Sequence, residues 1–390
     1  MISKLPFGLA KRLVDTVEPY TGLMGLGYSL DPKHKRGKEE FPPTFLEGLV
    51  QAGAIPSRLY SIYLNTLDRY GSILFGGLDT DKYKGPLTTL NCLRLRDREK
   101  VDNFYLDLEE IKMQPYNESS QTILRSTNDT KRLTLIDSGT PEWQLPMDVY
   151  TKVVEYAGAK LSSDKSSFVR ACSEVARCIV NTTYFDITFA GNGSNTANLR
   201  LELADLFTPV TTKSGSAVND DTGRPTCQLA VMPKSPRTPV LLTSSSVMRA
   251  GYWIFDLDNG QISLAQANLG ANSSNVVQVE AGPEGLKKAA KNIRAETQRD
   301  EVQGQTPVSK AYEFSTATNT VGYATGIKSY PILTGTGTHN PSSARNLPRG
   351  GSNPHVRRAE NAAASMASLE AYGLWVLCAA AIVAVGTVAV

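Results

Sequence analysis

Short β-prone segments separated by turn signals dominate residues 1–270, and they constrain the fold more than any other feature. The run Ser72–Phe75 is typical: it is rich in apolar residues and is closed by two glycines. Further along, the apolar runs 252–257 and 261–265 flank an Asp-Asn-Gly sequence. Because Asn-Gly between apolar runs is a strong hairpin signal, these two runs are expected to pair. Many short strands with regular turns predict an all-β fold.

Helical spacing is confined to a few stretches. Residues 45–52 and 147–158 have it, and Pro146 stands directly before the second. After residue 270 the chain becomes rich in Ser, Thr, Gly, Asn and Ala and poor in aromatic residues. Since such a composition buries little apolar surface, residues 271–360 are predicted to form a largely disordered stalk, with one short helix near 286–295.

Composition excludes several classes of function. The 390 residues carry 41 basic and 38 acidic side chains, a net charge of +3, which is too small to indicate a nucleic-acid partner. The sequence contains no H-E-x-x-H, C-x-x-C or P-loop spacing and no G-x-S-x-G elbow. We therefore predict no metal or phosphate site and no serine hydrolase of that type.

The C-terminal segment has the pattern of a surface anchor. Residues 371–390 carry no charge and are long enough to span a bilayer. Small residues at Asn361-Ala362-Ala363, a short spacer and this apolar tail match a GPI-attachment signal, with Asn361 as the attachment residue. The alternative for 361–390 is a transmembrane helix. Either one predicts contact with a membrane, through a lipid anchor or through the helix.

Glycosylation sequons point to the same route. Five N-x-S/T sequons occur, at Asn117, Asn128, Asn181, Asn192 and Asn272. The first residues after Met1 lack the apolar stretch of a signal peptide. We therefore expect that this sequence begins inside a longer, secreted protein.

One short loop carries the chemistry. A largely apolar run, 133–136, leads into Asp137-Ser138-Gly139-Thr140. Such a tetrapeptide alone is most often a plain turn, because Asp, Ser and Gly are common turn formers. Here, however, it follows a predicted strand and precedes Leu145-Pro146, which opens a predicted helix.

With these surroundings the chain resembles the pepsin-like aspartic proteases, in particular the fungal yapsins and candidapepsins. The resemblance covers most of residues 1–270 and is carried in the family's order by segments 21–28, 45–53, 61–65, 71–85, 137–140, 255–257 and 262–266. The resemblance implies an N-terminally truncated protease in which residues 1–65 are a remnant of the N-terminal lobe and residues 66–270 are a complete C-terminal lobe. It also implies a monomer that cleaves polypeptides without a cofactor.

The family's chemistry requires two carboxylates. Two Asp side chains that share one proton activate a water molecule and polarise the peptide carbonyl. Asp137 matches the C-terminal-lobe member, with Ser138, Gly139 and Thr140 as its support. No second D-T/S-G-S/T sequence occurs before Gly22, where the family places its first Asp.

Two alternatives to a single-chain peptidase stay open, and two departures from the family's pattern motivate the first of them. Ser244-Ser245 stand where the family has Gly-Asp, and Pro141 stands where Thr or Ser is usual. A side chain in place of that Gly is expected to crowd the Asp137 loop. The first alternative is a catalytically inactive, GPI-anchored surface glycoprotein. The second is that two copies each supply one Asp, but residues 1–65 resemble half of the lobe that a second copy would displace.

The resemblance also implies a disulfide and a location. Cys178 and Cys227 match the positions of the C-lobe disulfide, while Cys172 competes as a partner or pairs with Cys92. Cys378 lies in the tail that GPI attachment would remove. A disulfide suits an oxidising compartment, and we expect the protein at the cell surface, on the plasma membrane or cell wall.

Overall fold

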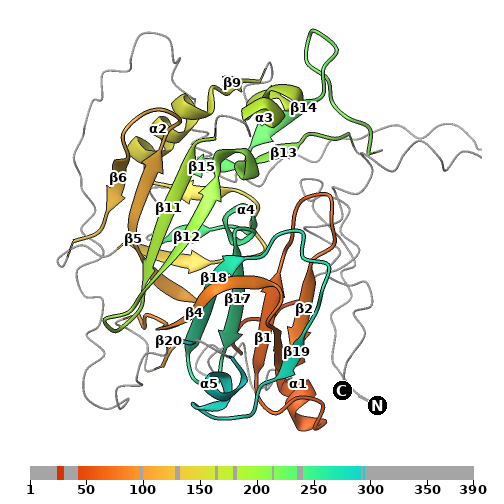
Figure 1. The fold of residues 1–390 in the computed structure, drawn as a ribbon, viewed down its shortest axis with the longest axis vertical. Helices are drawn as coiled ribbons and strands as arrows, with labels where there is room; N and C mark the ends of the chain where they lie inside the picture. The colour runs from red at the N-terminus through yellow and green to blue at the C-terminus, as the bar shows by residue number, and fades with distance from the viewer. Residues whose placement is uncertain are drawn as a thin grey trace, which may run out of the picture. The chain divides into compact units, whose positions relative to one another are not determined.

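The computed structural model confirms an all-β fold with short helices (Figure 1). It describes residues 24–29, 43–95, 100–127, 132–162, 166–178, 182–212, 215–234, 240–290 and 293–294. All of these residues belong to one compact unit.

A six-stranded sheet combines early and late strands of the chain. Its order is β2-β1-β17-β18-β4-β20. In chain order its strands are β1 (Leu59–Tyr63), β2 (Ser72–Phe75), β4 (Tyr83–Asn91), β17 (Gly251–Asp256), β18 (Gln261–Ala267) and β20 (Ile293–Arg294). Strand β1 lies in the part assigned to the N-terminal remnant, yet it is an interior strand that pairs antiparallel with β17. All its residues are buried, as the two covered faces of a central sheet require.

The predicted hairpin at residues 252–265 is present as β17 and β18, but its turn is longer than an Asn-Gly pair. Asp256 pairs with Gln261, so four residues form the loop. The Asp256 carboxylate accepts bonds from the backbone N–H of Asn259 at 3.0 Å and from its side-chain Nδ2 at 2.7 Å. Gly260 has φ +61°, in the left-handed region that glycine adopts without steric cost. The buried carboxylate therefore sets the turn.

An eight-stranded sheet carries the other large layer. Its path is β12-β11-β5-β7-β16-β8-β15, and β6 pairs with β5. Its strands are β5 (Tyr105–Gln114), β6 (Gln121–Arg125), β7 (Leu133–Ile136), β8 (Trp143–Leu145), β11 (Tyr184–Ala190), β12 (Thr196–Glu202), β15 (Val231–Pro233) and β16 (Leu241–Thr243). Side chains along β11 and β12 alternate between buried and more exposed positions, so one face packs on the core.

Among the described strand pairs of this larger sheet, two are parallel. β16 runs parallel to β7, and β15 runs parallel to β8. Because a parallel pair needs a crossover connection, residues far apart in the sequence meet at the ends of these strands.

The remaining elements are short. A four-stranded sheet has the order β13-β14-β10-β9, and β19 pairs with β3. Their bounds are β3 (Gly77–Asp79), β9 (Lys160–Leu161), β10 (Phe168–Ala171), β13 (Phe207–Pro209), β14 (Thr226–Leu229) and β19 (Val276–Gln278). The short helices are α3 (Cys172–Cys178), a 3₁₀ helix (Leu203–Leu206), α4 (Ser245–Met248) and α5 (Gly285–Ala289).

The two predicted helices form where the sequence places them. α1 (Phe45–Gln51) begins with a capping box, in which the Thr44 hydroxyl and the Glu47 carboxylate each accept the other residue's backbone N–H. α2 (Met147–Ala157) follows Pro146 and ends at Gly158, which has φ +58°.

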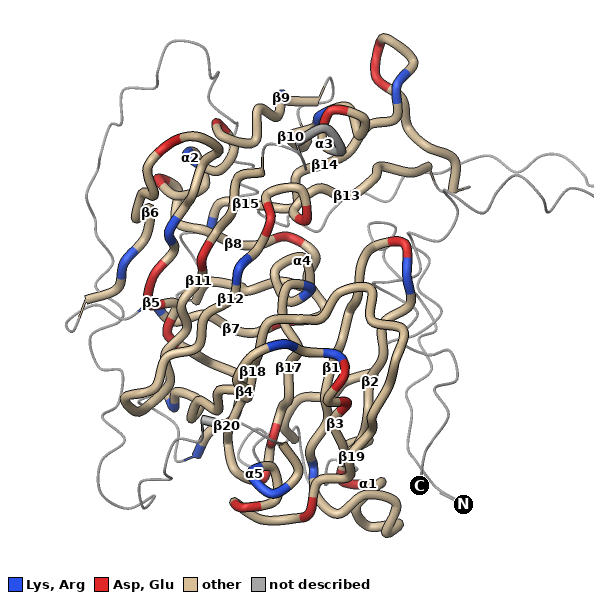
Figure 2. Tube along the Cα trace, in the orientation of Figure 1, with Lys and Arg blue, Asp and Glu red and all other residues tan. Residues whose placement is uncertain are grey.

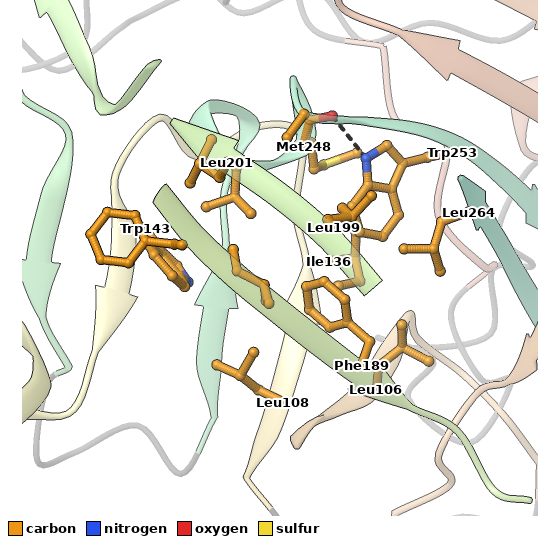
Figure 3. Close-up of a cluster of buried hydrophobic side chains, with 14 of the residues drawn as sticks. Leu106, Leu108, Ile136, Trp143, Phe189, Leu199, Leu201, Met248, Trp253 and Leu264 are labelled. Atoms are coloured by element: carbon orange, nitrogen blue, oxygen red, sulfur yellow. Dashed lines mark hydrogen bonds between the residues drawn. The ribbon is translucent and has the colours of Figure 1, made fainter. Parts of the chain in front are cut away.

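Apolar side chains from both large sheets meet in one core (Figure 3). Phe189 of β11 packs edge-on against Trp253 of β17, with ring centroids 5.7 Å apart. The Trp253 indole N–H donates to the Met248 carbonyl at 2.8 Å, so its polar edge is satisfied inside the core.

Gln266 links the two large sheets directly. Its side-chain carbonyl oxygen accepts from the Arg200 backbone N–H at 2.8 Å. Its amide nitrogen, Nε2, donates to the Arg200 carbonyl at 3.0 Å. The Gln266 side-chain amide thereby bonds the backbone of β12 as a residue of a neighbouring strand would.

Folded elements continue past the predicted boundary at residue 270, and one of them, α5, lies near the short helix predicted at 286–295. Residues 276–278 form β19, which pairs with β3, and α5 follows it. Val279 and Leu286 are buried in a second apolar cluster against the central sheet. These residues fold because the sheet supplies the apolar surface that their own composition lacks. Residues 295–360, the rest of the expected stalk, lie outside the described residues.

The predicted Cys178–Cys227 disulfide is also wrong. Cys227 is bonded to Cys172, with Cα atoms 5.0 Å apart. Antiparallel pairing of β10 with β14 places Arg170 opposite Cys227 and brings Cys172, just beyond β10, to it. Cys178 lies at the other end of α3, about 9 Å along the helix axis from Cys172. Cys92 is buried with a free thiol, and burial raises its pKa.

Basic and acidic residues are scattered over both large sheets (Figure 2). Within the described part of the chain, none of the helices has the length and apolar character that a membrane crossing demands. The predicted anchor at 361–390, with Asn361, lies outside the described residues, as do the sequons at Asn128 and Asn181.

Candidate functional site

Asp137 extends the end of β7 toward the loop that follows. The apolar run predicted before it is β7, whose residues Leu133 and Ile136 are buried. The Asp137 N–H donates to the Thr243 carbonyl at 2.9 Å and so continues the parallel pairing of β7 with β16. The Asp137 side chain itself is half-buried. Packing therefore fixes the backbone, while the carboxylate stays accessible.

Both oxygens of the carboxylate are held from within the loop. The Gly139 N–H donates to Oδ1 at 2.8 Å, and the Thr140 hydroxyl donates to Oδ2 at 2.7 Å. A Cβ atom on Gly139 would lie 3.2 Å from Oδ1, which is tight contact. Ser138 is half-buried within the same turn. Of the three predicted supporting residues, Gly139 and Thr140 thus bond the carboxylate.

Ser245 supports the loop from outside, a role that the sequence does not reveal. Its N–H donates to the Thr140 carbonyl at 2.9 Å, and its hydroxyl donates to the same oxygen at 3.3 Å. Ser245 is the first residue of α4 and lies more than a hundred positions beyond the loop. The residue whose hydroxyl holds Asp137 is itself held by a distant helix.

Ser244, which stands where the family has Gly, forms a buried hydroxyl pair next to Ser245. Its side chain is fully buried and its hydroxyl pairs with that of Ser246 at 2.7 Å. Beneath the loop, Thr134 and Thr243 form a second buried hydroxyl pair at 2.9 Å. Each hydroxyl in these pairs finds a partner, so the polar atoms are buried without an unpaired group. Pro141, directly after the loop, is exposed.

The hydrogen bonds to Asp137 within the described structure involve no second carboxylate. No group of three or more His, Cys, Asp or Glu side chains among the described residues could hold a metal ion. The site as described is one carboxylate in a rigid loop.

A second acidic group, Asp205, lies behind α4. It belongs to the 3₁₀ helix 203–206, and its backbone carbonyl accepts from Arg249, the C-cap of α4, at 3.3 Å. Burial raises the pKa of Asp205 to about 6, against the opposing effect of the Arg249 guanidinium. No local pattern indicates this raised pKa, because the burial of Asp205 comes from tertiary packing.

The three described sequons lie at different degrees of exposure. Asn117 is exposed and has φ +58°, a conformation that Asn tolerates in turns. Asn192 is half-buried after β11. Asn272 is exposed, and its side-chain oxygen accepts from Arg69 at 2.9 Å.

Comparison with known proteins gives a consistent family. A sequence model described as "Eukaryotic aspartyl protease" matches residues 1–267. The chain is 27% identical over 272 residues to the "Probable aspartic-type endopeptidase opsB" of Aspergillus fumigatus, covering 69% of this chain and 51% of the relative. It is 29% identical over 280 residues to "Aspartic proteinase 3" of Saccharomyces cerevisiae, covering 69% and 44%.

Two further matches complete this comparison. "Secreted aspartic protease 9" of Candida albicans is 28% identical over 218 residues, or 55% of this chain and 36% of the relative. Among solved structures, the aspartic proteinase from Irpex lacteus matches with a TM-score of 0.44 and 17% identity, over 62% of this chain and 66% of that one. The chain spans about half the length of the first curated relatives it matches.

Proposed function

The chain belongs to the eukaryotic aspartyl protease family, and from that premise we propose that it supplies the Asp137 half of an aspartic-type endopeptidase. Peptide bonds would be hydrolysed by a water molecule held between Asp137 and a second carboxylate. The observation that carries the proposal is the fixed geometry of Asp137, whose two oxygens each accept a hydrogen bond from the loop.

That geometry suits the chemistry. A general base must keep its lone pairs aimed at water throughout the reaction, and a pre-oriented carboxylate loses no free energy to reorientation. The Thr140 hydroxyl and the Gly139 N–H hold the group, while its half-buried position leaves it reachable by a substrate. The second carboxylate would share a proton with Asp137, because two such charges at close range do not both ionise.

The test is peptide cleavage at acidic pH by the full-length protein purified from its natural host. Asp137→Asn keeps the shape of the side chain and removes its charge, and it should lower kcat/KM at least about a thousandfold. Asp148→Asn, which changes an exposed carboxylate in the first turn of α2, is the matched control and should leave kcat/KM unchanged. Equal cleavage by the Asp137 variant and the wild type would remove the peptidase proposal.

The inactive surface glycoprotein is the second candidate. It is supported by the absence of another carboxylate from the hydrogen bonds to Asp137 among the described residues. Full-length wild-type protein that cleaves no peptide would favour it. Sedimentation of the same preparation tests whether the protein is a monomer. A dimer that loses peptide cleavage when it dissociates would favour two copies that share the site.

The proposal extends to the cell surface, glycosylation and a GPI anchor. The Cys172–Cys227 bond is suited to an oxidising compartment, and one relative is named a secreted protease. Exposed Asn117 and Asn272 are positions where a glycan fits. Digestion with an N-glycosidase should reduce the apparent mass, and a phosphatidylinositol-specific phospholipase should release the protein from membranes. A protein that phospholipase leaves membrane-bound would contradict the GPI anchor.

A further inference from the structure

We propose that residues 271–290 are a brace, a separable folded segment that covers the outer face of the central sheet and is locked there by Asp79. The match to the family model ends at residue 267, so the brace lies beyond the part of the chain that this model describes. The surface it covers is apolar, and its occupant is this chain's own segment. The brace lies between β18 and β20, so the folded unit continues past residue 270 to residue 294 at least.

The lock is a buried carboxylate. Asp79, at the end of β3, is 3% exposed. Its Oδ2 accepts from the Ser274 hydroxyl at 2.6 Å, and its Oδ1 accepts from the Asn275 N–H at 2.8 Å. The backbone N–H of Asp81, which is not part of the brace, donates a third bond to Asp79 Oδ1 at 3.1 Å. Hydrogen bonds to a charged group are the stronger kind, and two of the three come from the brace.

Basic side chains hold the entry to the brace. Lys82 Nζ donates to the carbonyls of Ala271 at 3.0 Å and Ser273 at 2.8 Å. Arg69 donates to the carbonyl of Gly270 at 3.2 Å. These contacts guide the chain away from β18 and toward Asp79, where β19 begins to pair with β3.

The far end of the brace supplies the apolar cover. Val279, at 1% exposure, and Leu286, at 5%, pack in the cluster that contains Tyr252 and Ile254 of β17. The Val279 N–H donates to the Gly76 carbonyl at 2.9 Å and fixes the register. In Figure 2 the segment runs beside β3 as β19, and α5 lies below the central sheet in this view. Without the brace, these aromatic and aliphatic side chains of β17 would face water.

One close approach shows that the return to α5 is built for a small residue. A Cβ atom on Gly285 would lie 1.9 Å from the Glu280 carbonyl oxygen, which no side chain can occupy. Lys288 of α5 also pairs with Glu280 at 2.8 Å. The brace thus has internal contacts of its own and can move as a unit.

Hydrogen exchange followed by mass spectrometry on the full chain tests the proposal. In the wild type, the amides of 275–279 and 286–290 should share one opening rate, faster than that of β17 and β18. Asp79→Asn should speed exchange in the brace at least about tenfold while leaving β17 and β18 within about twofold. Asp148→Asn, which changes an exposed carboxylate in the first turn of α2, should change neither.

Two outcomes overturn the proposal. One is a brace whose exchange is unchanged in Asp79→Asn, and the other is equal acceleration in the brace and in β17, which would mean one indivisible unit. If Asp79→Asn does not fold, a second pair of variants tests the brace at its apolar contacts. Leu286→Ala removes a buried side chain of α5, and Lys287→Ala is its control. Faster exchange of 275–279 in the Leu286 variant alone supports the brace, and unchanged exchange overturns it. None of these readouts depends on peptidase activity, so they stand or fall separately from the proposed function.

Discussion

At the scale of single residues, the Asp137 carboxylate is held by donors that are themselves positioned by the fold. The Thr140 hydroxyl bonds Oδ2, and Ser245 bonds the Thr140 carbonyl through both its N–H and its hydroxyl. The loop sequence supplies the first of these contacts. The second requires α4 to lie against the loop, and this makes Ser245 a positioning residue for the proposed reaction.

Removing the Thr140 hydroxyl should weaken catalysis more than folding. Thr140→Val keeps the size of the side chain and loses one hydrogen bond to a charged group, so we expect kcat/KM to fall about tenfold to a hundredfold. Thr140→Ser retains the hydroxyl and should stay within about threefold of the wild type. Steady-state peptide hydrolysis by the full-length protein measures both, and equal losses in the two variants would contradict this role of the hydroxyl.

Asp205 should make stability depend on pH. Its pKa is raised from 3.8 to about 6 in the folded protein, so the folded state binds the proton more tightly than the unfolded state does. Stability from this group is therefore present below about pH 4 and is lost as the pH rises to about 6, by at most about 3 kcal/mol. Asp205→Asn should remove that loss. Urea unfolding at pH 4 and pH 7 measures the difference, and an unchanged pH slope in the variant would refute the assignment.

At the scale of elements, local sequence signals give the helices and the hairpin, while pairing between strands decides which residues meet. The β10–β14 register brings Cys172 to Cys227. Cys178, six residues further on, is the last residue of helix α3, which Cys172 begins. The family's spacing suggested Cys178, and the register selects Cys172.

The disulfide assignment predicts unequal effects of two substitutions. Cys172→Ser opens a loop with a sequence separation of 55 residues and should cost about 4 kcal/mol in the chain-entropy model. Cys178→Ser should leave the free energy of unfolding nearly unchanged. Denaturant unfolding measures the costs, and peptide mapping of the non-reduced protein identifies the bonded pair. A Cys178–Cys227 peptide in the map would show that the family's spacing holds after all.

At the scale of the whole described unit, two large sheets share one core and are also joined by polar contacts. Gln266 of β18 bonds both the N–H and the carbonyl of Arg200 on β12. Its Nε2 also donates to the Ala250 carbonyl at 3.0 Å. A single side chain therefore bridges the sheet that contains β1 and the sheet that contains Asp137.

Breaking this bridge should destabilise the unit as a whole. Gln266→Met keeps the side-chain length but leaves the Arg200 N–H and carbonyl without their partner, at a cost of about 1–3 kcal/mol. Gln278→Met, at an exposed position on β19, is the control and should cost little. Thermal and urea unfolding compare the two, and similar melting temperatures for the two variants would argue against the bridge.

The sequence by itself determined the features that depend on neighbouring residues. The strand before Asp137, the turn at 137–140, the capping box of α1 and the hairpin of β17 and β18 each follow from residues within a few positions of one another. The resemblance to a family followed from the order of such segments. Local backbone preferences and hydrogen bonds fix these features before the chain is packed.

Only the tertiary structure decided the rest. The Ser245–Thr140 contact, the Cys172–Cys227 bond and the brace at 271–290 join residues that are distant in the sequence. These contacts form only when the strands pair in the right register and when an apolar face of a sheet remains to be covered. A local sequence pattern predicts neither condition. Residues 271–290 show the reason most clearly: their composition is that of a stalk, and they fold because Asp79 and the outer face of the central sheet offer the charge and the apolar surface that the segment lacks.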